Sequence, residues 1–134
     1  MTGAAIVGEL LRSDAAVTHV VPTASIKGGR LPDDAVLPVL LVRSISVVDR
    51  QTLAREAMVR STERISVTVR AATHRDRGAI VKLIRTACTG VVLPEFEDAR
   101  NISVLTAGAG PELNGPGNSF ERSQDFSVTY DAPA

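Results

Sequence analysis

Cys88 and His74 are the two side chains best suited to nucleophilic chemistry in this sequence. A cysteine attacks as its thiolate, and a neighbouring imidazole can take the proton from the thiol. Both residues fall on one predicted helix, His74 in the first turn and Cys88 in the last. A rise of about 1.5 Å per residue separates them by about 20 Å along the helix axis. We therefore interpret Cys88 as a small apolar residue of the core.

Two groups of carboxylates invite comparison with the acid and base of a glycoside hydrolase. One group is Asp33 with Asp34, and the other comprises Glu95, Glu97 and Asp98. Both groups lie in loop-like sequence, without flanking aromatic side chains that could hold a sugar. Solvated loop charge explains them better than catalysis.

A glycine-rich segment over residues 108–117 resembles a phosphate-binding loop that follows a strand. Such a loop must open a helix, because the helix N-terminus binds the phosphate. Pro111, Pro116 and a following strand leave no helix here, so a plain hairpin loop is predicted. With one cysteine and two histidines, the sequence also offers no cysteine-pair zinc site. We expect no enzyme activity, no cofactor and no bound metal.

Arginine has the most informative distribution of any residue type. Thirteen of the fifteen basic residues are Arg, and residues 43–77 hold eight of them against four acids. Residues 91–134 hold seven acids against two arginines. Such blocks are usually solvated surfaces, but Arg pairs well with carboxylates and is enriched at protein interfaces. The two blocks suit head-to-tail association of copies, which closes into a ring when the rotation permits.

The candidate interface residues come from both blocks. They are Arg50, Arg55, Arg60, Arg64, Glu95, Glu97, Asp98, Glu121 and Asp125.

Composition narrows the functional class further. The chain has 134 residues, 44% of them apolar and 22% charged, which suits a single domain over residues 1–134. A formal net charge of zero argues against a general duplex-DNA binder, and only four aromatic residues argue against a base-stacking platform. A nucleic-acid-binding adaptor that uses the eight arginines of residues 43–77 remains the alternative. No apolar stretch approaches the roughly 20 residues of a membrane span, and no signal peptide is expected.

The apolar spacing predicts the elements that position these residues. A helix is expected over about residues 2–13, then a short helical turn over residues 15–20 that ends before Pro22. Thr73 and Asp76 predict the N-cap of a second long helix, which Gly90 ends. Strands are predicted over residues 39–48 (largely buried), 64–70 (one face buried, one face wet), 101–107 and 120–130.

Two segments stay open at this point. Residues 49–63 fit either one or two helical turns or a long hairpin connection, and a short edge strand before residue 39 is an option. The predicted fold is α+β: a two-layer sandwich of an antiparallel or mixed β-sheet of four to five strands, with two helices packed on one face.

The order of features resembles the tail-completion proteins of long-tailed bacteriophages. The resemblance rests on the opening IVGELLRSDAAV at residues 6–17 and on Leu-Pro pairs at 31–32 and 37–38 before an aliphatic strand. It also rests on residues 65–72, which lead into a helix near Asp76, and on the closing FSVTY at 126–130. It covers nearly the whole chain and implies a small α+β structural protein similar to tail terminators.

The resemblance implies a virion protein of the tail or neck, present in the host cytoplasm during assembly. Such a protein forms a ring, commonly a hexamer, at the head-proximal end of the tail tube, terminates the tail and joins it to the head-side connector. The implied partners are further copies of the chain, the tail-tube protein and the connector or stopper protein. Genome DNA would pass through the lumen without sequence-specific binding, and residues 49–64 would project toward a neighbouring subunit or ring. The family has no catalytic residues to carry over.

Overall fold

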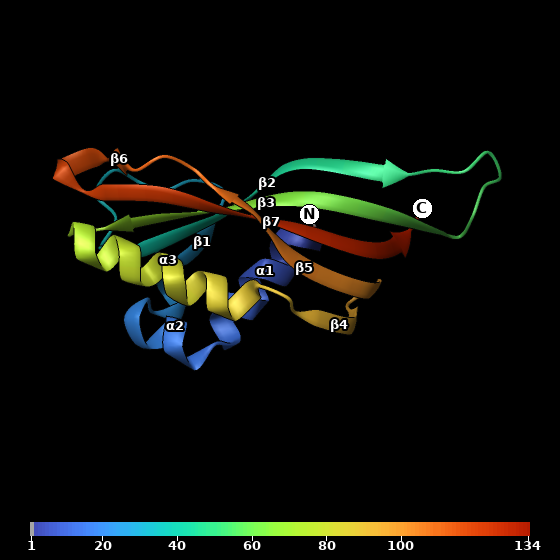
Figure 1. Cartoon of the computed structure of the whole chain (residues 1–134), viewed down its shortest axis with the longest axis horizontal. Helices are drawn as coiled ribbons and strands as arrows, with labels where there is room; N and C mark the ends of the chain where they lie inside the picture. The colour runs from blue at the N-terminus through green and yellow to red at the C-terminus, as the bar shows by residue number, and fades with distance from the viewer. Residues whose placement is uncertain (1) are drawn as a thin grey trace.

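A mixed β-sheet with helices on one face makes up the chain, of which the computed structural model describes residues 2–134 (Figure 1). Within these residues the sheet has seven strands in the order β1-β2-β3-β7-β5-β4, and β6 pairs with β7. The strands are β1 (Ile26–Gly28), β2 (Val39–Arg50), β3 (Met58–Ala71), β4 (Val92–Phe96), β5 (Ala99–Ala109), β6 (Leu113–Asn114) and β7 (Phe120–Pro133). The helices are α1 (Thr2–Ser13), α2 (Ala15–Val20) and α3 (His74–Cys88).

The centre of the sheet is the antiparallel pair of β3 and β7. Its register runs without a shift from Met58 opposite Pro133 to Ala71 opposite Phe120. β2 lies on the other side of β3, also antiparallel, with a bulge between Ser44 and Ser46. β1 adds a short parallel contact to β2, so the sheet is mixed, as predicted.

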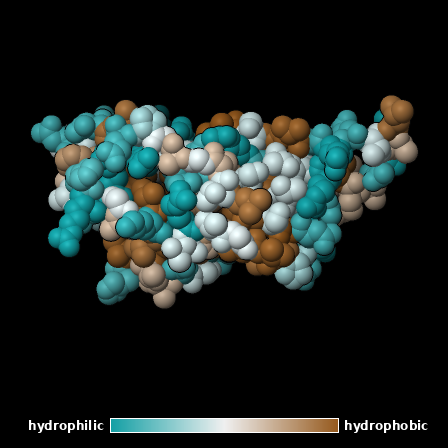
Figure 2. Space-filling model, in the orientation of Figure 1, coloured by the Kyte–Doolittle hydropathy of each residue, from teal (hydrophilic) through white to brown (hydrophobic). Residues whose placement is uncertain are grey.

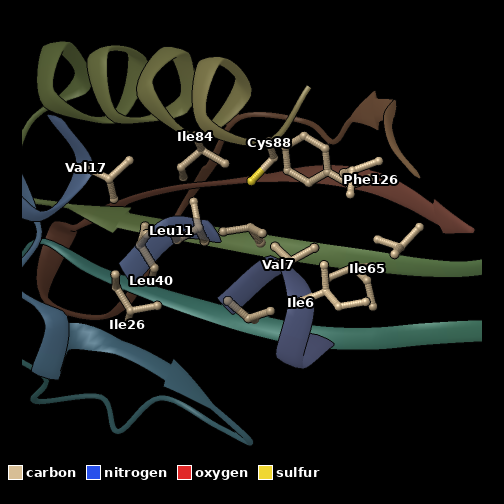
Figure 3. Close-up of a cluster of buried hydrophobic side chains, with 14 of the residues drawn as sticks. Ile6, Val7, Leu11, Val17, Ile26, Leu40, Ile65, Ile84, Cys88 and Phe126 are labelled. Atoms are coloured by element: carbon tan, nitrogen blue, oxygen red, sulfur yellow. The ribbon is translucent and has the colours of Figure 1, made fainter. Parts of the chain in front are cut away.

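The hydrophobic core lies between the helices and one face of this sheet (Figure 3). Alternate residues of a strand point to opposite faces, so Ile65, Val67 and Val69 of β3 all face the helices. Ile6 and Leu11 of α1 pack on this layer together with residues of α3. The apolar spacing that predicts α1 and α3 therefore marks their buried faces.

Cys88 belongs to this core, at the C-terminal end of α3. Its side chain is fully buried, and burial raises the pKa of the thiol to about 12. His74 lies at the opposite end of the same helix. The interpretation of Cys88 as an apolar core residue is confirmed.

Side-chain caps set the start of two helices, as the sequence predicts for α3. The Thr73 hydroxyl accepts a hydrogen bond from the amide of Asp76 at 3.0 Å. The Asp14 carboxylate accepts one from the amide of Val17 at 3.1 Å and begins α2. These bonds satisfy amides that the first helical turn leaves without a partner.

A buried carboxylate ties α1 to the two central strands. Glu63 of β3 is fully buried, and its Oε1 accepts hydrogen bonds from the Gly3 amide at 3.0 Å and from the Tyr130 hydroxyl at 2.8 Å. The positive end of the helix dipole favours a carboxylate at this position. Burial and the bond to Glu63 together raise the pKa of Tyr130 above its ordinary value.

The predicted number of four to five strands is wrong. Two further strands, β4 and β6, lie in segments whose composition indicates loops, and the optional edge strand is present as β1. β4 contains a proline and a glutamate in five residues, and β6 has two residues, so neither shows an alternating pattern. Such short strands form because a neighbouring strand supplies the hydrogen bonds.

Two further expectations about β2 and the segment after it need correction. β2 is buried only over Val39–Val42, and from Arg43 on its side chains are mostly exposed. The helical alternative for residues 49–63 is wrong, since β2 runs to Arg50 and β3 begins at Met58. The connection is a long hairpin, which projects from the body of the molecule (Figure 1).

The docking of α1 on Glu63 generates a testable prediction. A Cβ at Gly3 would lie 2.7 Å from Cδ of Glu63, so Gly3→Ala forces α1 away from the sheet. We expect the free energy of unfolding to fall by about 1–3 kcal/mol, the usual cost of overpacking. Urea unfolding followed by circular dichroism measures this change.

Gly78→Ala is the matched control for this experiment. Gly78 lies within α3, and a Cβ there meets nothing within 4 Å. Because alanine favours helix, this variant is expected to gain about 0.5–1 kcal/mol. Equal effects of the two substitutions would contradict the close packing of α1 on Glu63.

Candidate subunit interface

The face of the sheet opposite the helices carries polar side chains along its two central strands, and we call this face the bare face. Its central part consists of side chains of β3 and β7 that point away from the core. Three arginines of β3 pair there with carboxylates of β7: Arg60 with Asp131 at 3.0 Å, Arg64 with Asp125 at 2.8 Å and Arg70 with Glu121 at 3.2 Å.

Hydroxyl groups fill the spaces between these ion pairs. Thr62 and Thr129 are joined by a hydrogen bond of 3.2 Å between their hydroxyls, and Thr68 and Ser123 by one of 2.9 Å. The bare face therefore alternates balanced ion pairs with hydroxyl pairs.

Four of the candidate interface residues lie on this face, namely Arg60, Arg64, Glu121 and Asp125. The basic and acidic blocks of the sequence meet here within one chain, because β3 and β7 are neighbours in the sheet. The sequence also predicts that the basic block of one copy contacts the acidic block of another copy, and for these four residues that contact stays a prediction.

Asp131, which charge distribution along the sequence did not single out, is bonded to two different side chains on the bare face. It accepts hydrogen bonds from Nδ2 of Asn101 at 2.9 Å and from Nη1 of Arg60 at 3.0 Å. These bonds hold the pKa of Asp131 below its ordinary value. The candidate list missed Asp131 because its partners are distant in the sequence.

The acidic candidates of residues 95–98 lie at the β4 side of the sheet. Glu95 is part of β4, and its carboxylate is 3.7 Å from Nε of Arg100 on β5. Glu97 and Asp98 form the exposed turn between β4 and β5, where Glu97 has a φ of +52°. The structure thus groups these three acids at one edge, separate from Glu121 and Asp125.

Arg50 and Arg55 lie on the projecting hairpin, at the opposite edge of the sheet. Arg50 ends β2 and Arg55 belongs to the loop of residues 51–57, and both are exposed. Neither makes an ion pair with any residue of 2–134. The loop curls around a hollow of about 590 Å³.

Exposed apolar side chains accompany these charges, and sequence reasoning missed them. Val48 of β2 is 68% exposed, Val92 of β4 is 75% exposed, and Leu53 in the hairpin loop is fully exposed. In Figure 2 hydrophobic surface marks the tip of the projecting hairpin. The sequence pattern placed Val48 in a buried strand, since nothing local shows that its side chain lies on the bare face in one row with Thr62 and Thr129.

The residues considered for catalysis do not converge. His74 contacts Nη2 of Arg77 through its Nδ1 at 2.7 Å, far along α3 from Cys88. Residues 108–117 contain β6 and the start of a short 3₁₀ turn (Pro116–Asn118), with no α-helix to bind a phosphate.

Among residues 2–134 no three His, Cys, Asp or Glu side chains are grouped as metal ligands would be. Over the same range, no helix combines the length and the apolar character that a membrane crossing requires.

A model of the family described as tail completion protein gp17 matches residues 5–131 of the 134. The chain belongs to this family. It is a structural protein of a phage tail, and the resemblance stated from the sequence is confirmed. A search among curated proteins finds no match to the chain. The family places the protein with other components of the tail and head, and the surfaces described above are those it can offer to them.

The Asp131 pair makes a prediction about pH. Because its folded-state pKa is lowered, Asp131 stabilises the fold above the ordinary Asp pKa of about 3.9, and this contribution is lost as the pH falls through the folded-state pKa. We expect Asp131→Asn to lower the free energy of unfolding at neutral pH by less than about 1 kcal/mol. Urea unfolding of both proteins at several pH values measures the difference.

The difference between the two proteins should shrink as the pH falls from about 4 to about 2. Asp33→Asn is the control, because Asp33 is exposed in a loop. This substitution should leave the free energy of unfolding unchanged at neutral pH and at low pH. A difference that stays constant down to the lowest pH would show that Asp131 acts through shape and not through its charge.

Proposed function

We propose that the chain forms a ring, most simply a hexamer, at the head-proximal end of the phage tail tube. The ring terminates the tail and joins it to the head-side connector or stopper protein. Membership of the tail completion family supports this function. The observation that carries the proposal is the bare face, whose charges are balanced in pairs.

A balanced polar face suits the wall of a lumen through which DNA moves. Unpaired arginines would bind phosphates and hold the genome, since phosphate neutralisation dominates DNA affinity. Arg60, Arg64 and Arg70 are each paired with a carboxylate, so this part of the face has little net charge. In the proposed ring the bare face lines the lumen and the helices lie outside.

This assignment departs from what the charge blocks of the sequence indicate for a ring, namely acidic or neutral side chains inside and arginines turned toward protein contacts. In the proposed ring, arginines do face the lumen, but carboxylates of the same chain neutralise them. The balance of charge, rather than the absence of arginine, permits passage of DNA.

The hairpin is the surface proposed to contact the tail tube or an adjacent ring. It extends beyond the helices and carries Leu53 and Arg55 at its loop (Figure 1). Arginine is enriched at protein interfaces, and the fully exposed Leu53 adds apolar surface beside it. The other partners, the connector and the neighbouring copies, then use the remaining edges.

The alternative of a nucleic-acid-binding adaptor is less well supported by the structure. Of the eight arginines in residues 43–77, four are ion-paired within the chain: Arg60, Arg64, Arg70 and Arg77. Charges already paired with carboxylates release fewer counterions when DNA binds, which lowers affinity. DNA binding at low salt that falls steeply as salt rises would favour this alternative.

The proposed tube contact predicts the effect of a change at the hairpin loop. Leu53→Asp combined with Arg55→Glu should weaken binding to purified tail tubes by about tenfold or more, as at an interface hot spot. Both side chains are exposed, so the unfolding midpoint should stay unchanged. Co-sedimentation with tubes and negative-stain images of the tube ends measure the binding.

Leu113→Asp is the matched control, because this exposed leucine lies in β6 at the far end of the molecule (Figure 1). It should bind tubes as the wild type does. If the wild type neither decorates tube ends nor associates with itself at any concentration, the proposed function is wrong. If the loop variant binds undiminished, the hairpin is not the contact.

A further inference from the structure

The sheet has two free edges in residues 2–134. β1 covers only Leu40–Val42 of β2, so the outer edge of residues 43–50 is not paired with any strand. At the other side of the sheet β4 pairs with β5 alone. Unpaired edges present rows of backbone N–H and C=O groups that can bind another strand.

The two free edges lie at the same level of the sheet. One row of register partners runs across the strands through Val48, Thr62, Thr129, Ser103 and Val92. The next row runs through Arg50, Arg60, Asp131, Arg100 and Glu95. Each row therefore begins at the free edge of β2 and ends at β4.

The side chains at the two ends of each row are complementary. Val48 and Val92 end the first row, and both are largely exposed. Arg50 and Glu95 end the second row. Arg50 has no ion-pair partner in residues 2–134, and the Glu95 side chain is 66% exposed. A second copy placed beside the first, in the direction in which the strands follow one another in the sheet, would bring its Val48 near Val92 and its Arg50 near Glu95.

The strand directions fix how two copies would meet. Each step from β2 through β3, β7 and β5 to β4 is antiparallel, so β2 and β4 run in the same direction. Copies related by rotation about an axis along the strands keep that direction. The contact between β4 of one copy and β2 of the next is then parallel and heterologous, which is the type that closes rings.

We propose that the free edge of β2 pairs in parallel with β4 of the next copy, with Val48 beside Val92 and Arg50 within reach of Glu95. The step from Val92 to Glu95 is one residue longer than the step from Val48 to Arg50, because β5 has a bulge between Arg100 and Ser103. This contact rests on the proposed ring and names the surface that builds it. The sheets of all copies then form one continuous wall. The occupant of each free edge is thus a second copy of this chain.

The same edges are built to avoid uncontrolled pairing. Pro94 removes one backbone donor from β4, and the bulge near Ile45 interrupts β2. Proline, bulges and charges are the usual means by which free edges resist aggregation. The joint is therefore short, so we expect free copies to associate weakly and to close the ring on a tail tube.

The proposed pairing fixes the approximate size of the ring. Five strands at a spacing of about 4.8 Å give each copy a width of about 24 Å at this level. A ring of six copies would then measure about 46 Å across at the strand backbone. A ring of that size in electron microscopy would support the arrangement, and a ring of a very different strand diameter would count against it.

A disulfide between copies tests the contact directly. Val48 and Val92 are separated by three strands within one chain, so a bond between cysteines at these positions joins different copies. Parallel neighbours lie within the Cα distance that a disulfide needs. The experiment places Val48→Cys with Val92→Cys in the full chain, assembles tails from it, oxidises them and runs non-reducing gels.

A ladder of dimers and higher multimers from the double variant is the expected result. Each single variant, Val48→Cys or Val92→Cys, should stay monomeric on the gel, and Cys88 is buried and should not compete. Dimers from Val48→Cys alone would show that β2 pairs with β2, which would overturn the proposal. Absence of a ladder from tails that contain the folded double variant would overturn it as well.

Charge reversal gives a second test, in which the double variant should restore what each single variant loses. Arg50→Glu and Glu95→Arg should each lower ring occupancy of tails by about tenfold, because like charges then meet at the joint. The double variant should recover most of the loss, as partners in a mutant cycle do. Arg75→Glu makes the same change on the exposed side of α3 and should have no effect. Without recovery in the folded double variant, Arg50 and Glu95 are not partners.

These experiments separate the two levels of the proposal. A wild-type ring at the tail end, together with no disulfide ladder from the variant with Val48→Cys and Val92→Cys, would leave the function intact and remove this contact. Wild-type protein absent from the tail end would remove the proposed function itself.

Discussion

The pairing of β3 with β7 is the interaction on which the rest of the structure depends. It joins segments that are some 60 residues apart in the chain and keeps one register along its whole length. Each backbone hydrogen bond contributes only about 0.5–1.5 kcal/mol net, but the ladder also fixes which side chains share a face. One face then carries the apolar residues that bind α1 and α3, and the other carries the ion pairs of the bare face.

Glu63 connects this ladder to the helical layer. Its carboxylate receives the amide at the start of α1 and the hydroxyl of Tyr130, so it contacts α1 and β7 from its own strand β3. A buried carboxylate is costly unless donors surround it, and losing one donor leaves the charge poorly satisfied. The helices cover the sheet up to this point, and beyond it β2 and β3 continue as the hairpin. The boundary between the rigid body and the projecting hairpin therefore lies near Glu63.

Local patterns in the sequence predicted the parts of this fold that local forces determine. Apolar spacing and capping residues gave the bounds of α1, α2 and α3 closely. The pattern could not show that β4 forms, because a five-residue strand with Pro94 depends on the hydrogen bonds of β5. Nor could it show that Val48 is exposed, since the face to which it points depends on the pairing of β2 with β3. The charge blocks indicated Arg50 and Glu95, yet they also indicated Arg64 and Asp125, which the ladder pairs within the chain.

The distribution of paired and unpaired charge gives the bare face and the edges different roles. Along β3 and β7, arginines and carboxylates are balanced within the chain, so this surface has little electrostatic attraction for other molecules. At the edges, Arg50 has no ion-pair partner in residues 2–134, and Glu95 makes a long contact of 3.7 Å with Arg100 while staying 66% exposed, so opposite signs face outward on opposite sides. Complementary charges steer association and fix register more than they add affinity. In the proposed ring, charge complementarity therefore directs copies to meet edge to edge, while the ion pairs of β3 and β7 keep the lumen close to neutral.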